Sequence, residues 1–163
     1  MATLAELVER KSLEPWLVKL VGRQPPMRQV HVTMRFKKWA QTDLRTIPST
    51  HWGGEVPVVD QVTDIIRQFR SGAALHFSRQ FNFLTPIDSG VWELKTGDVR
   101  LFGWFPSFDS FIAGIGGDAN FIKDSPKVRY AECVDLVVKD RDALDLDNPK
   151  FISSTDPRDV IST

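Results

Sequence analysis

The fold of this protein is decided by residues 91–105, which read VWELKTGDVRLFGWF. Two apolar-rich runs, residues 91–95 and 99–105, flank the short polar run Thr96-Gly97-Asp98. A short connection that contains glycine, placed between two such runs, is typical of a β-hairpin. We therefore predict a hairpin here, ended by Pro106, and a further strand over residues 111–115.

Helices and one more strand are predicted on either side of the hairpin. Residues 30–36 alternate between apolar and polar side chains, which predicts a half-buried strand. Apolar side chains recur with the helical period over residues 57–70, and Ser125-Pro126 is a typical start for a last helix. Shorter helices are expected within residues 4–21 and over residues 37–47. We expect an α+β fold, a small antiparallel sheet of about four strands with helices packed on one face.

The chain has 163 residues, which suits one domain with a substantial core. We divide it into an N-terminal helical extension (residues 1–28), an α+β domain (residues 29–145) and a loose acidic C-terminal tail (residues 146–163). The tail is expected to be loose because it contains two prolines and little apolar periodicity.

Charge is balanced overall but not along the chain. Lys and Arg together number 21, as do Asp and Glu, so the formal net charge is zero. Residues 1–45 hold nine basic and four acidic side chains, whereas residues 140–163 hold three basic and six acidic ones. A neutral protein lacks the general attraction of a basic protein for nucleic acids, although it can still carry a local basic face.

Several classes of protein are excluded by what the sequence lacks. A single cysteine, Cys133, excludes an internal disulfide and a cysteine-based zinc cluster. No apolar run approaches the roughly 18 residues that span a membrane, and two early glutamates argue against a secretory signal. We expect a cytoplasmic protein. Common phosphate-loop, dinucleotide and zinc motifs are missing, and the histidine spacing indicates no metal site, so no cofactor is expected.

The main candidates for chemistry are cationic side chains on elements predicted to be neighbours. Positive charge on adjacent strands, close to a helix start, suits the binding or cleavage of an RNA phosphodiester. The alternative is an ordinary charged strand face. The candidate residues are Arg35, Lys95, Arg100, Lys123, Lys127, Arg129 and the single tyrosine, Tyr130.

Aromatic residues crowd the second strand of the hairpin. Phe105 shares a face with Val99 and Leu101, so we expect it in the core. Phe102 and Trp104 share the face of Arg100. They are candidates either for stacking on bases or for burial under additional helices.

Residues 91–102 resemble the central hairpin of the RelE/ParE toxin superfamily, in which an aromatic residue, Glu-Leu-Lys or Glu-Leu-Arg, a glycine-containing turn and a strand arginine follow one another. Residues 111–136 are similar to the phage Gp49/HigB-like branch, with Gly117, Pro126 and Ala131 as the matching points. The resemblance spans roughly residues 30–140 and implies that residues 29–145 form a RelE-like domain. It implies the toxin of a type II toxin–antitoxin system, a ribosome-associated mRNA endonuclease that a small antitoxin protein neutralises.

Two functions from different classes remain open. The first is an RNA-cleaving toxin that acts on mRNA at the ribosome, with Arg100, Lys123 and Tyr130 as catalytic residues. Its RNA-binding residues would be Arg35, Lys95, Lys127 and Arg129. The second is a catalytically inactive binding module of phage or prophage origin that holds a protein partner. Zero net charge and the apolar-rich, aromatic N-terminal extension, with Trp16, Leu17 and Leu20, favour the second function.

Overall fold

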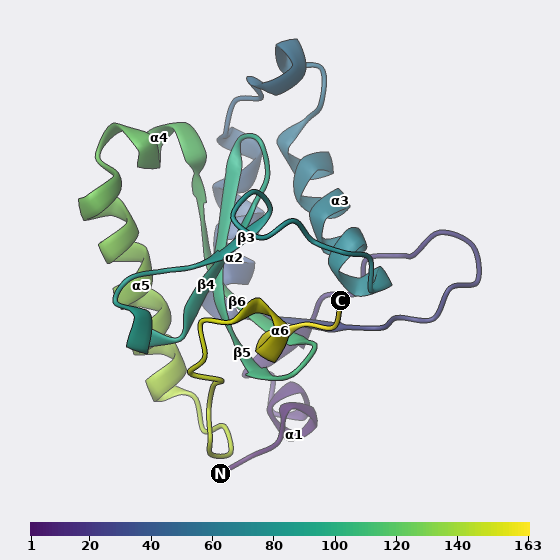
Figure 1. The fold of residues 1–163 in the computed structure, drawn as a ribbon, viewed down its shortest axis with the longest axis vertical. Coiled ribbons are helices and arrows are strands. Elements are labelled where there is room, and N and C mark those ends of the chain that lie inside the picture. The colour runs from purple at the N-terminus through teal and green to yellow at the C-terminus, as the bar shows by residue number, and fades with distance from the viewer.

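A mixed six-stranded sheet runs through the middle of the molecule, and helices cover both of its faces (Figure 1). The computed structural model describes residues 1–163. Strands β2 and β6 are parallel, and every other neighbouring pair is antiparallel. In spatial order, the strands are β1 (Leu13–Pro15), β2 (Gln29–Thr33), β6 (Ser110–Asp118), β5 (Val99–Ser107), β4 (Val91–Lys95) and β3 (Phe81–Phe83).

The predicted fold class was wrong in three respects. The sheet has six strands rather than about four, one strand pair is parallel, and both faces are covered. Helix α3 (Val58–Ser71) packs on one face, where Phe69 meets Phe105 and Phe111. Helix α5 (Pro126–Ala143) packs on the other face, where Val137 belongs to the same cluster as Trp104. None of the helices is both long and apolar enough to cross a lipid bilayer.

The hairpin and the two long helices lie where the sequence predicts them. Strands β4 and β5 pair on either side of residues 96–98. Helix α3 ends at Gly72, whose φ of 80° is a left-handed conformation that glycine adopts at little cost. Helix α5 has Pro126 in its first turn, as expected, although the Ser125 side chain forms no capping hydrogen bond.

The N-terminal third differs from the prediction. Helix α1 (Leu4–Glu9) has the expected capping box between Thr3 and Glu6. The second helix expected within residues 4–21 is absent, because β1 pairs with β2 as an edge strand. Strand β2 ends at Thr33, whose hydroxyl caps α2 (Met34–Thr42) by accepting from the Phe36 amide at 3.2 Å. The predicted strand therefore stops three residues early, and the following helix begins early.

Short elements account for most of the remaining differences. They are the 3-10 turns η1 (Leu44–Thr46), η2 (His51–Gly54) and η3 (Ile87–Ser89), with helix α4 (Ala119–Asp124). Strand β5 continues past Pro106 to Ser107, and β6 continues past the predicted end at residue 115 through Gly116 and Gly117. Gly116 is needed in β6 because a Cβ atom there would lie 2.2 Å from the indole ring of Trp39.

The C-terminal segment, expected to be loose, packs against the body of the protein. Ile152 donates a backbone hydrogen bond to Phe105 at 2.8 Å. Helix α6 (Pro157–Val160) follows, and Val160 and Ile161 are buried in the α3-side core. The buried guanidinium of Arg28 donates to the Ser162 carbonyl at 2.7 Å. Residues 146–163 therefore close one end of the core.

Candidate functional site

Three of the seven predicted site residues meet in one pocket. Lys95, Lys127 and Tyr130 line a cavity of about 450 Å³ between β4, the segment after β3 and the start of α5. Glu93 also lines this cavity, which we call the Glu93 pocket. Its full lining is Asn82, Phe83, Leu84, Thr85, Glu93, Lys95, Pro126, Lys127, Tyr130 and Ala131.

The other predicted cations are placed elsewhere or already have partners. Arg35 lies on α2 rather than on a strand and forms an ion pair with Asp140 of α5. Arg129 stacks over the Phe121 ring at 3.3 Å and donates to the Phe121 carbonyl. Lys123 lies in the last turn of α4, outside the Glu93 pocket. These three residues therefore do not join the pocket in a single cationic surface.

Arg100 is hydrogen-bonded to the backbone of its own hairpin, and its charge also offsets part of the rise in the pKa values of nearby Glu93 and Tyr130. Arg100 is only 9% exposed, and its guanidinium donates to the carbonyls of Thr96 and Val99 at 2.5 and 3.2 Å. Phe102 and Trp104 are fully buried on the α5 side of the sheet. They pack in the core, so they are not available to stack on bases.

The lining of the Glu93 pocket includes the buried carboxylate of Glu93. Glu93 is 2% exposed and its Oε2 atom has no hydrogen-bond partner. Lys95 Nζ lies 3.6 Å from Glu93 Oε1 and also donates to the Ser78 carbonyl. Burial raises the pKa of Glu93, and nearby Lys95 offsets part of that rise. Burial, with the Glu93 charge, raises the pKa of Tyr130 to about 12. An anionic phosphate would meet this carboxylate, so the pocket is poorly suited to phosphate.

A second feature is an exposed tryptophan on the connection between α2 and α3. Trp52 is 66% exposed and has φ 50° and ψ 44°, a left-handed conformation that is unusual for a bulky residue. Gly53 and Gly54 continue the positive φ values. We call residues 49–56 the Trp52 loop.

Asp98 holds the Trp52 loop to the hairpin. Its fully buried carboxylate accepts from the backbone amides of Thr50 and His51 at 2.9 and 3.2 Å, and from Gln61 Nε2 at 2.9 Å. The Thr50 hydroxyl also donates to it. Burial alone would raise the pKa of Asp98, but the hydrogen bonds from Gln61 and Thr50 outweigh burial and place that pKa far below its usual range.

Packing reinforces these hydrogen bonds. The His51 ring lies directly over Gly97, where an added Cβ atom would come within 2.5 Å of the ring. The Ser49 hydroxyl donates to the Val56 carbonyl at 2.5 Å and closes the base of the loop. The Trp52 and His51 rings form a T-shaped pair, with centroids 5.7 Å apart. Trp52 is therefore exposed but held in position.

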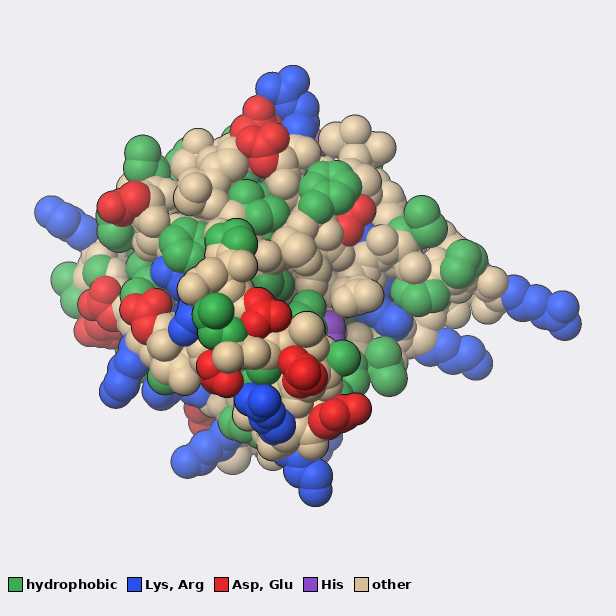
Figure 2. Space-filling view, turned by 90° about the horizontal axis from the view of Figure 1, so that it is seen from below, with side chains coloured by type: hydrophobic (Ala, Val, Ile, Leu, Met, Phe, Trp, Pro, Cys, Tyr) green, Lys and Arg blue, Asp and Glu red, His purple; other side chains and the backbone are tan.

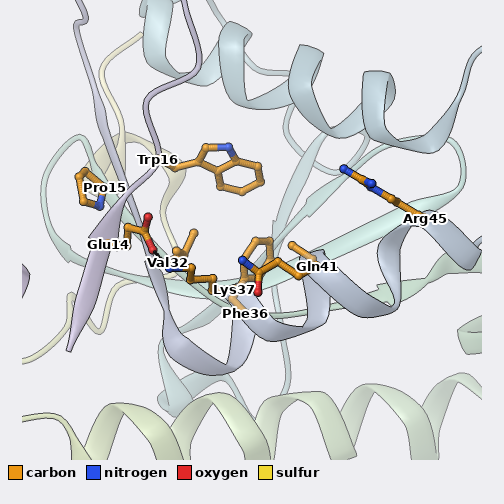
Figure 3. A pocket seen from close by; sticks show the side chains of 9 residues that line it. Glu14, Pro15, Trp16, Val32, Phe36, Lys37, Gln41 and Arg45 are labelled. Carbon is orange, nitrogen blue, oxygen red and sulfur yellow. Dashed lines mark ion pairs between the residues drawn. The ribbon is translucent and has the colours of Figure 1, made fainter. Parts of the chain in front are cut away.

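A third feature is a groove beside the edge strand β1, with a volume of about 310 Å³ (Figure 3). Trp16 and Phe36 form its aromatic wall, with ring centroids 5.2 Å apart. Lys37 and Arg45 bring positive charge to it. We call it the Trp16 groove, and its lining is Glu14, Pro15, Trp16, Val32, Phe36, Lys37, Ala40, Gln41 and Arg45.

Comparison with known proteins returned no match. No family model, no curated protein and no solved structure is significantly similar to this chain. The resemblance to the RelE/ParE superfamily therefore stays a prediction. The sequence analysis assigned no role to His51 or Trp52. The one hint in the sequence was Asp98, an acidic residue in the hairpin turn, but no neighbouring residues indicate which groups it binds.

Proposed function

We propose that this chain is a binding module without catalytic activity of its own, and that it holds a protein partner with Trp52 as an anchor. The observation that carries the proposal is the exposed Trp52 indole on a loop held by the buried Asp98 carboxylate. Tryptophan is among the residues most enriched at the energetic centres of protein interfaces. A loop already held in one conformation loses little entropy when a partner binds.

The backbone of Trp52 gives a second line of support. A bulky residue in the left-handed region costs on the order of 1–3 kcal/mol, and an indole that is 66% exposed recovers little burial energy. A strained, exposed aromatic residue that its surroundings hold in place is typical of a binding surface. Beside it lies a cavity of about 470 Å³, whose lining includes the polar residues Asp64, Arg79 and Gln80. An aromatic centre beside polar groups matches the usual anatomy of an interface.

The endoribonuclease hypothesis has weaker support. In its favour, Lys95, Lys127 and Tyr130 share one pocket. Against it, Arg100 is bound to backbone carbonyls and a buried carboxylate lies at the base of that pocket. Acidic and basic side chains are also interspersed over the face in Figure 2, with no continuous basic patch there. We therefore rank partner binding first, and place it in the cytoplasm, where the lone thiol of Cys133 stays reduced.

Affinity purification tests the proposal. The tagged full chain, expressed in the cells that carry its gene, is expected to retain a protein at a fixed ratio. Trp52→Ala should reduce that retention at least about tenfold, as expected for a residue at an energetic centre. Phe108→Ala is the matched control, since Phe108 is also a large exposed apolar residue, at 52%.

Two results would overturn the proposal. One is equal retention of the partner by the parent chain and Trp52→Ala. The other is ribosome-dependent mRNA cleavage by the purified chain that Lys127→Ala or Tyr130→Phe abolishes, which would establish the toxin function instead.

A further inference from the structure

The Trp16 groove combines apolar walls with a cationic end. Figure 3 shows Trp16 entering from the segment after β1, with Lys37 and Gln41 rising from α2. Arg45 of η1 reaches in from the opposite end. Phe36 and Val32 are buried beneath and are 1% and 8% exposed. A volume of about 310 Å³ is at the lower end of the range for binding pockets, so the groove suits one or two side chains.

Positive charge in the groove is only partly neutralised. Lys37 Nζ forms an ion pair with Glu14 at 2.7 Å, which uses the one acidic residue of the lining. Arg45 is exposed and forms neither an ion pair nor a side-chain hydrogen bond. The lining therefore holds two basic side chains and one acidic side chain, a net charge of +1 that favours an anionic ligand.

We propose that the Trp16 groove receives a short acidic segment of the protein partner. An apolar side chain of that segment packs against Trp16, and a neighbouring Asp or Glu carboxylate pairs with Arg45. This inference rests on the proposed function and adds the chemistry of the partner to it. Arg45 and Trp52 both belong to the connection between α2 and α3.

A random peptide display library, selected on the intact protein, tests the groove directly. The selected peptides are expected to carry an apolar residue flanked by Asp or Glu. Their affinity should fall at least about tenfold in Arg45→Glu, because charge reversal turns attraction into repulsion. Arg23→Glu makes the same change in net charge on an exposed residue outside the groove, and it should change the affinity less than about twofold.

Three results would overturn the inference: no selected peptide that depends on Arg45, selected peptides without acidic residues, or a dimer of this chain that Arg45→Glu dissociates. The last would show that a second copy fills the groove. Because Arg45 is exposed, its replacement should leave the fold intact, and circular dichroism checks this. If Trp52→Ala still releases the partner while Arg45→Glu does not, the groove inference fails and the proposed function stands.

Discussion

Asp98 and Glu93 are both buried carboxylates of the β4–β5 hairpin, yet their surroundings act in opposite directions. Asp98 accepts hydrogen bonds from Thr50, His51 and Gln61, which lower its pKa. Glu93 has one oxygen without any partner, and burial raises its pKa. The structure favours the charged form of Asp98 and disfavours the charged form of Glu93.

The charge of Asp98 therefore stabilises the structure, whereas the charge of Glu93 destabilises it. Around Asp98, Thr50 and His51 of the Trp52 loop, Gln61 of α3 and Asn120 of α4 all donate to the carboxylate, so its charge fixes the Trp52 loop to the hairpin. Around Glu93, the charge is poorly compensated, which costs stability near neutral pH. If this comparison is right, removing the two charges should have opposite effects on the free energy of unfolding.

The largest expected effect is the loss of the Asp98 charge. Asp98→Asn should lower the free energy of unfolding at neutral pH by about 3 kcal/mol, since several hydrogen bonds to a buried charge are weakened together. Urea unfolding followed by circular dichroism measures this loss. Asp88→Asn, at an exposed position, should change stability by no more than about 0.5 kcal/mol.

The pH dependence gives an independent check of the same residue. The folded-state pKa of Asp98 lies below the ordinary value of 3.8, so its contribution is present above pH 3.8 and is lost as pH falls toward the folded-state pKa. The stability gap between the parent chain and Asp98→Asn should therefore narrow in acid. A stability difference that stays constant or widens as pH falls would contradict the lowered pKa of Asp98.

Glu93→Gln should raise the free energy of unfolding, by less than Asp98→Asn lowers it. Because the folded-state pKa of Glu93 is raised, its favourable contribution is present below the unfolded pKa and disappears as pH rises through the folded pKa. Gln keeps the shape without the charge, so the variant should gain about 1 kcal/mol at neutral pH and little in acid. Urea unfolding curves at neutral pH and in acid measure this gain. A lower free energy of unfolding at neutral pH would show instead that Lys95 compensates the Glu93 charge.

Tyr130 reports on the Glu93 charge by a smaller shift. It is the only tyrosine of the chain, so the ultraviolet absorbance of phenolate follows this residue alone. The pKa of Tyr130, read as the midpoint of this titration, should be about 12 in the parent chain. It should fall in Glu93→Gln but stay above 10.0, because Tyr130 remains buried. Glu132→Gln, on the exposed side of α5, is the control and should leave the midpoint in place. Circular dichroism identifies the pH range in which the protein stays folded, and only absorbance within that range is used.

The smallest expected effect on stability comes from Trp52→Ala. An exposed indole contributes little burial, and alanine relieves part of the crowding in the left-handed conformation, so the free energy of unfolding should change by no more than about 0.5 kcal/mol. Urea unfolding at neutral pH checks this. A loss above about 2 kcal/mol would mean that Trp52 is a packing residue, and the comparison between a presenting loop and a buried pocket would fail.

The candidate site could be predicted only in part. Of the seven candidates named from the sequence, Lys95, Lys127 and Tyr130 line one pocket, and they belong to elements with clear local patterns, the hairpin and α5. The Trp52 loop was not anticipated as a site. Asp98 binds Thr50, which is 48 residues earlier in the chain, and Gln61, which is 37 residues earlier. No local pattern connects such residues.

The sequence alone determined the hairpin, α3 and the start of α5, because periodicity, turn residues and proline act over a few neighbouring positions. Only the tertiary structure decided the parallel pairing of β2 with β6, since Val30 meets Phe111 across 81 residues. It also decided that both faces of the sheet are covered, which turned Phe102 and Trp104 from candidate binding residues into core. The strand itself alternates in the same way whether its second face meets water or a helix. The helix that packs against it comes from elsewhere in the chain.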